Sequence, residues 1–180
     1  MRSPALRRLV FQALLAAVYA ALTMALSFMS YGPVQFRIAE ALCILPFFFP
    51  GCVWGLTVGC LLANLISAYG VLDIVFGTLA TLLSCLAVAA LGRGNRRSWP
   101  RCIAACFMPV VFNALIVGAL IAYFETDCFF TGAFWPAFWF DAGTVGLGEL
   151  VVLYVIGLPL MRILPKKKIY TKMEAVLLAP

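Results

Sequence analysis

The sequence predicts an all-α integral membrane protein with six transmembrane helices and both termini in the cytoplasm. Of its 180 residues, 65% are hydrophobic and only 11% are charged, whereas soluble domains average about 45–50% apolar and about 25% charged residues. All lysines and arginines except Arg37 gather before the first apolar run, at residues 93–101, or after the last run. Basic segments beside apolar spans follow the positive-inside rule, so the net charge of +6 orients the protein in a lipid bilayer and does not indicate nucleic-acid binding.

Six apolar runs are the expected spans: Leu9–Met29, Gln35–Phe49, Gly51–Ser67, Leu72–Leu91, Cys102–Phe124 and Asp141–Ile163. They form one membrane domain over residues 9–163, between a basic N-terminus (1–8) and a basic cytoplasmic tail (164–180). The first run has about 21 residues, longer than the core of a signal peptide (about 7–15), and no A-x-A cleavage pattern follows it. We therefore expect this run to be retained as a transmembrane helix.

The second span is the shortest. It has about 15 residues, or roughly 22 Å of α-helix against a hydrocarbon core of about 30 Å, and Pro46 interrupts it. An alternative fuses residues 41–68 into one broken helix, which leaves five spans. Six spans put the three basic clusters on the cytoplasmic side, whereas five would put the mid-chain cluster and the tail outside. The positive-inside rule therefore favours six.

Small residues recur every four positions in the first and third spans: Ala13, Ala17, Ala21 and Ala25 in the first, and Gly51, Gly55, Gly59 and Ala63 in the third. This spacing allows close approach of helices in a membrane. We expect the glycine stripe to pack inside the protein. The alanine stripe either packs inside as well or forms a face for another protein.

Two features lie near the last span. The segment 124–140 is rich in Phe and Trp, which indicates either an interfacial aromatic belt or a lid that stacks on a flat aromatic ligand. The stretch DAGTVGLGEL (141–150) carries Gly143, Gly146 and Gly148 beside Glu149. These glycines leave room either for a ligand or for a neighbouring helix.

Ionisable and amide side chains are rare within the spans, and a charge at a helix centre costs roughly 2.5–3.5 kcal/mol. Singly, each has a structural explanation: an i,i+3 ion pair between Arg37 and Glu40, a helix cap at Asp73, or contacts between helices for the asparagines. Jointly they fall in the outer half of the bilayer or near its midplane. They therefore predict a polar cup that opens outward, formed by Arg37, Glu40, Asn64, Asp73, Asn113 and Glu149.

Several kinds of site are absent from the sequence. The chain has no histidine, and its seven cysteines are scattered without a C-x-x-C pair, so no zinc site and no Ser–His or Cys–His catalytic pair is expected. No lysine precedes Lys166, which excludes a phosphate-binding loop of the G-x-x-x-x-G-K-[ST] type in the membrane domain. We predict neither an enzyme nor a resident cofactor, and expect the cysteines to act as small buried hydrophobes.

The chain resembles the QueT family of queuosine-precursor transporters over residues 9–163. The segments that carry the resemblance are YGPVQFRIAEALCILPFFFPG, GLTVGCLLANLIS, GVLDIVFGTLATLL, PVVFNALIVG and VGLGELVVLYVIGLPL. The resemblance implies a six-helix substrate-binding (S) component of an energy-coupling-factor (ECF) transporter in a bacterial cytoplasmic membrane. Its implied partners are a transmembrane coupling protein and two ATPases, and the implied contacts to the coupling protein are Ala13, Ala17, Ala21 and Ala25.

The implied ligand is a 7-deazaguanine base, whose adjacent N–H donors suit a carboxylate. We expect Glu149 or Glu40 to read this edge and Gln35, Asn64 and Asn113 to supply amide contacts. Asp73 would orient the cup, while Arg37 would contact either the ligand or only Glu40. The alternatives are an S component for another nutrient, and a stand-alone proton-coupled transporter that uses Glu149.

Overall fold

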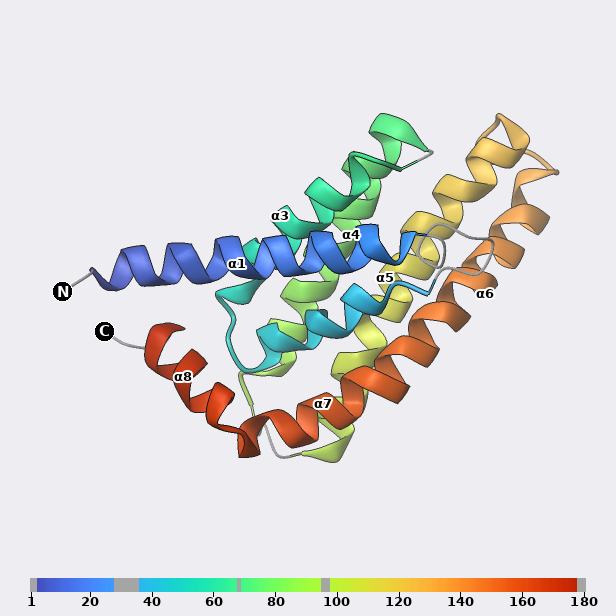
Figure 1. Cartoon of the computed structure of the whole chain (residues 1–180). Coiled ribbons are helices and arrows are strands. Elements are labelled where there is room, and N and C mark those ends of the chain that lie inside the picture. Colours follow the sequence, from blue (N-terminus) through green and yellow to red (C-terminus); the bar gives the residue numbers. More distant parts are fainter. Residues whose placement is uncertain (1–2, 28–35, 68, 95–97, 178–180) are drawn as a thin grey trace.

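The computed structural model describes residues 3–27, 36–67, 69–94 and 98–177, and every regular element in these residues is helical. The elements are α1 (Pro4–Ala25), η1 (Ile38–Phe47), α3 (Cys52–Asn64), α4 (Gly70–Leu91), α5 (Trp99–Thr126), α6 (Phe134–Val152), η2 (Leu153–Gly157), α7 (Leu158–Ile163), η3 (Leu164–Lys166) and α8 (Lys168–Leu177). Figure 1 shows them as one helical bundle. The predicted all-α class is confirmed.

Among the described residues, four helical segments are long and apolar enough to cross a membrane: α1, α4, α5, and the continuous helical segment Phe134–Lys166. The second and third predicted spans correspond to shorter helices, η1 with 10 residues and α3 with 13. η1 is a 3₁₀-helix that contains Pro46, and its rise of about 2.0 Å per residue gives a length of about 20 Å. The chain reverses direction between η1 and α3 (Figure 1), so the two do not form the single broken helix of the five-span alternative.

Three predicted boundaries differ clearly from the structure. Helix α1 begins at Pro4, five residues before the predicted start at Leu9, so residues 4–8 of the predicted N-terminus are helical. Helix α6 begins at Phe134, within the aromatic segment, so Asp141 is not at the start of the last span but two turns inside the helix. The predicted tail contains α8, which packs on the bundle through Tyr170 and Met173. Tyr170 contacts Phe48 and Phe49 in the turn after η1, with ring centroids 5.7 and 5.1 Å apart.

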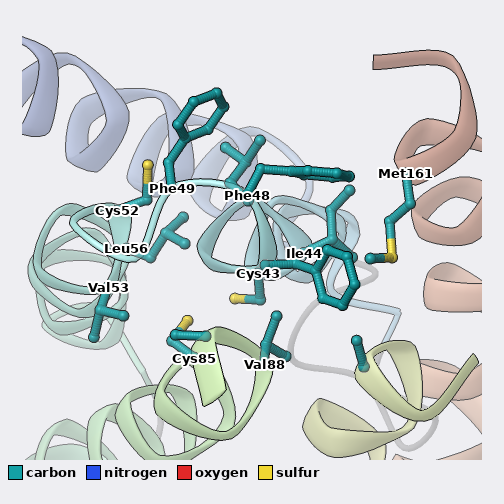
Figure 2. Close-up of a cluster of buried hydrophobic side chains, with 14 of the residues drawn as sticks. Cys43, Ile44, Phe48, Phe49, Cys52, Val53, Leu56, Cys85, Val88 and Met161 are labelled. Carbon is teal, nitrogen blue, oxygen red and sulfur yellow. The ribbon is translucent and has the colours of Figure 1, made fainter. Parts of the chain in front are cut away.

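The apolar core surrounds η1 and the turn that follows it. Figure 2 shows side chains from η1, α3, α4 and α7 converging there, among them Ile44, Leu56, Val88 and Met161. Six of the seven cysteines are buried and Cys128 is exposed. Burial of these six cysteines confirms their expected role as small buried hydrophobes.

Helices α1 and α3 cross at very short distance because glycines face α1. A Cβ atom at Gly59 would lie 2.8 Å from the carbonyl oxygen of Ala16, and one at Gly55 would lie 2.9 Å from that of Gln12. The Gly55 N–H donates to Gln12 Oε1 at 2.9 Å. The prediction that the glycine stripe packs internally is confirmed at these two positions, whereas Gly51 is exposed.

Candidate functional site

The polar side chains predicted to form a cup are all buried in the interior of the bundle. Their exposed fractions are 0–2% for Arg37, Glu40, Asn64, Asp73, Asn113 and Glu149. They come from five elements: the start of η1, α3, α4, α5 and α6. Gln35 lies outside the described residues. Burial of six such groups requires partners for them, and the contacts below supply only part of what they need.

Arg37 forms an ion pair with Asp73, with Arg37 Nη2 3.7 Å from Asp73 Oδ2. Glu40, the predicted i,i+3 partner, is also near enough to interact electrostatically with Arg37. Asp73 lies in the first turn of α4, and neither of its carboxylate oxygens accepts a hydrogen bond from the described residues. Asp73 therefore does not cap α4 through a hydrogen bond, although the helix dipole favours an acidic residue in this first turn. Its carboxylate also faces the arginine at the start of η1.

Asn64 joins α3 to α4. Its Nδ2 donates to the backbone oxygen of Asp73 at 3.1 Å, which agrees with a role for this asparagine between helices. Gly77 makes room for the pair, since a Cβ atom there would lie 2.6 Å from Asp73 Oδ1 and 2.7 Å from Asn64 Nδ2. A glycine one turn after Asp73 therefore lets two buried polar side chains occupy the same level of the bundle.

Glu40 receives hydrogen bonds at one of its two oxygens. The hydroxyl of Tyr19 on α1 donates to Glu40 Oε1, and Thr81 Oγ1 on α4 donates to the same oxygen at 3.2 Å. Within the described part of the chain, Glu40 Oε2 is buried and accepts no hydrogen bond. The protein therefore holds one oxygen of the Glu40 side chain with two hydroxyl groups and leaves the other without a hydrogen bond from the described residues.

Glu149 on α6 repeats this arrangement. Asn113 Nδ2 donates to Glu149 Oε1 at 3.2 Å, while Glu149 Oε2 and Asn113 Oδ1 accept no hydrogen bond from any described residue. Glu149 interacts electrostatically with both Glu40 and Arg37. We call these six buried side chains the polar cluster.

The polar cluster is richer in acceptors than in donors. It holds three acidic side chains and one guanidinium, and its buried atoms that accept no hydrogen bond among the described residues are Glu40 Oε2, Asn64 Oδ1, Asp73 Oδ1 and Oδ2, Asn113 Oδ1 and Glu149 Oε2. Each unsatisfied buried acceptor costs about 1–3 kcal/mol. Such a cluster can bind a ligand that brings several N–H donors or a positive charge.

Sequence reasoning missed Tyr19, Cys60 and Thr81. Cys60 Sγ accepts from Thr81 Oγ1 at 3.2 Å and from Asn64 Nδ2 at 3.5 Å, so this cysteine lies beside the polar cluster. A lone tyrosine in the alanine-rich first span was the only available signal for Tyr19. Asp141, the first residue of the last predicted span, is also buried, with an exposed fraction of 4%.

The aromatic segment packs largely on itself. Tyr123 and Phe129 stack with ring centroids 4.2 Å apart, and Phe134 and Phe138 stack at 5.9 Å. Several members are exposed, namely Phe124, Phe129, Phe130, Trp135, Trp139 and Phe140. Tyr123 and Phe129 also line an apolar groove of about 510 Å³ between α4 and α5, which includes no member of the polar cluster.

Two of the three glycines predicted near Glu149 differ in the space around them. A Cβ atom at Gly143 would meet nothing within 4 Å, whereas one at Gly146 would lie 3.3 Å from Ala114 Cβ on α5. Packing between helices therefore explains Gly146. The alanine stripe of α1 faces outward, since Ala13, Ala17, Ala21 and Ala25 are all exposed.

Comparison with known proteins shows which family this chain matches. A family model described as QueT transporter matches residues 9–166. The chain is 42% identical over 73 residues to a protein named queuosine precursor transporter QueT from Lactococcus lactis subsp. cremoris (strain MG1363). That match covers 39% of this chain and 43% of the relative, less than half of either. No solved structure matches the chain significantly.

Proposed function

The chain belongs to the QueT family of transporters, and on that premise we propose that it is the substrate-binding component of an ECF importer for a queuosine precursor. Because the family consists of transporters and the described residues include four long apolar helices, the chain is a multi-pass membrane protein and not an enzyme. In our proposal it captures a 7-deazaguanine base at the polar cluster from the outer side of a bacterial cytoplasmic membrane. The membrane domain crosses six times, with η1 and α3 as the two short crossings.

The observation that carries the proposal is the pair of half-satisfied carboxylates. Glu40 and Glu149 each have one oxygen held by the protein and one that accepts no hydrogen bond from the described residues. A guanine-like edge presents a ring N–H beside an exocyclic amino group, and a carboxylate accepts such a pair in a bidentate manner. The base also carries an acceptor oxygen, for which the Arg37 guanidinium is a suitable donor.

Charge favours the aminomethyl form of the precursor. The polar cluster contains three acidic side chains and the single guanidinium of Arg37, and buried like charges repel each other strongly. An aminomethyl substituent is protonated at neutral pH and brings the positive charge that this cluster lacks. One of Glu40 and Glu149 would read the guanine edge while the other binds the ammonium group.

We also propose that the bound base is delivered through a coupling protein and two ATPases. The exposed alanines at positions 13, 17, 21 and 25 leave a smooth surface on α1, and small residues at this spacing allow another membrane helix to approach closely. An apolar groove of about 320 Å³ beside them, lined by Ala13, Trp54 and Val58 among others, extends this surface onto α3.

A binding titration with the purified protein in detergent tests the ligand assignment. We expect the aminomethyl 7-deazaguanine base to bind, and Glu40→Gln and Glu149→Gln each to weaken binding at least about tenfold, because a hydrogen bond to a charged group contributes about 1.5–3 kcal/mol. The analogue with a nitrile in place of the aminomethyl group should bind more weakly to the unchanged protein.

Glu125→Gln is the matched control, because Glu125 is an exposed acidic residue at the end of α5, outside the polar cluster. It should bind the base as the unchanged protein does. Full affinity in both Glu40→Gln and Glu149→Gln would show that the carboxylates are assigned wrongly.

A further inference from the structure

Tyr19 is the largest side chain that α1 buries in the bundle, with an exposed fraction of 1%. Its hydroxyl donates to Glu40 Oε1, across 21 positions in the sequence. A tyrosine hydroxyl in a membrane interior needs a hydrogen-bond partner, and a buried carboxylate is the strongest acceptor available. The contact is therefore a polar link between the first helix and the polar cluster.

We propose that Tyr19 is a positioning residue that fixes the Glu40 carboxylate for the ligand; this inference rests on the proposed role of Glu40 in binding. With Oε1 held by Tyr19 and Thr81, the carboxylate cannot rotate freely about its last bond. Oε2 is then the oxygen that remains for a ligand N–H donor, as its lack of a donor among the described residues indicates.

Thr81 alone would hold Glu40 Oε1 less firmly than the two hydroxyls do together. Its single hydroxyl proton has two acceptors at the same distance, Glu40 Oε1 and Cys60 Sγ, each 3.2 Å away. Without the tyrosine hydroxyl, Glu40 would depend on a donor that is shared with Cys60. The carboxylate would then sample other rotations, and part of the ligand's binding free energy would be used to restore the bound orientation.

The test compares three variants of the full chain, purified in detergent and titrated with the aminomethyl 7-deazaguanine base. Tyr19→Phe keeps the ring and removes the hydroxyl, and we expect it to weaken binding about tenfold. Thr81→Val should weaken binding less, because Tyr19 still holds Oε1. Thr23→Val is the matched control: Thr23 is equally buried on α1, and its hydroxyl donates at 3.0 Å to the backbone oxygen of Tyr19 and not to Glu40. We expect it to bind like the unchanged protein.

Two double-variant cycles separate positioning from a merely structural role. If Tyr19 acts through Glu40, the loss caused by Tyr19→Phe should shrink at least about threefold in a Glu40→Gln background, whereas it should stay the same in a Glu149→Gln background. A general loosening of α1 would leave both backgrounds alike.

The outcomes are distinct. Equal affinity in Tyr19→Phe and the unchanged protein would overturn this inference alone, as would equal weakening by Tyr19→Phe and Thr23→Val. Failure of the unchanged protein to bind the base would overturn the proposed function, and this inference with it.

Discussion

At the scale of single residues, the Arg37–Asp73 ion pair connects the start of η1 to the first turn of α4. Both side chains are almost completely buried, where the cost of removing charges from water is large and is offset only by close opposite charge. Removing one partner is therefore much more damaging than replacing both with apolar groups.

Asp73→Asn should lower the free energy of unfolding by about 3 kcal/mol, because the buried guanidinium loses the carboxylate opposite it. The double variant Arg37→Met with Asp73→Leu should recover a large part of this loss. Thermal unfolding of the purified proteins without ligand gives the order of the midpoints. An unchanged midpoint for Asp73→Asn would mean that the pair does not contribute to stability.

Part of the polar cluster was predictable because charged and amide side chains are rare in the apolar spans. A charge or an amide stands out in an apolar span, and Arg37, Glu40 and Glu149 were found because burying them is costly. Tyr19 and Thr81 were not found, because tyrosine and threonine are ordinary residues in membrane helices. Their role depends on which helix lies opposite, and that information is held in the packing and not in the local sequence.

At the scale of elements, α1 and α3 cross with their backbones in close contact. Gly55 and Gly59 bring the backbone of α3 against Gln12 and Ala16. Dispersion contacts at such short range hold membrane helices together without any hydrophobic driving force. The two helices therefore depend on the absence of side chains at two positions.

Gly59→Leu should destabilise the protein by several kcal/mol, about 3 or more, because the new side chain would collide with the Ala16 backbone and with Tyr19. Gly143→Ala is the control within a helix: a Cβ atom there meets nothing within 4 Å, and alanine is favoured over glycine in a helix by about 1 kcal/mol. Unfolding midpoints of the two variants should therefore shift in opposite directions. A normal midpoint for Gly59→Leu would contradict the close crossing.

The sequence-based elements were right where long apolar runs define a helix, as in α4 and α5. They failed at α6, because the Phe- and Trp-rich residues before Asp141 suggested an interface or a lid, although they form the first two turns of the helix. The helix α8 was also missed, since its charged residues were assigned to a tail. In both cases, contacts with distant parts of the chain decide the conformation.

At the scale of the whole molecule, the proposed function requires partners, and this requirement separates it from a stand-alone carrier. We expect uptake of the labelled base by cells that contain this chain together with a coupling protein and two ATPases, and none by vesicles that contain this chain alone under a membrane potential. Uptake by the chain alone would favour a proton-coupled carrier that uses Glu149.

The same uptake assay tests the alanine stripe by comparing two variants. Ala21→Trp should preserve base binding and lower uptake at least about tenfold, because a large side chain would hold the partner helix away from α1. Val75→Trp is the control, since Val75 is exposed on α4, and its uptake should be unchanged. Equal uptake by both variants would remove α1 from the contact with the coupling protein.

Helix α1 has its buried and exposed residues on opposite faces. Ala17 and Ala21 lie two residues before and after Tyr19, about 200° around the helix, so they are exposed where Tyr19 is buried. Thermodynamic linkage then gives a reciprocal relation: if ligand at Glu40 changes the affinity of α1 for a partner by some factor, the partner changes the affinity for ligand by the same factor. A base that promotes docking is thereby held more tightly in the docked state, so its release needs an input of energy.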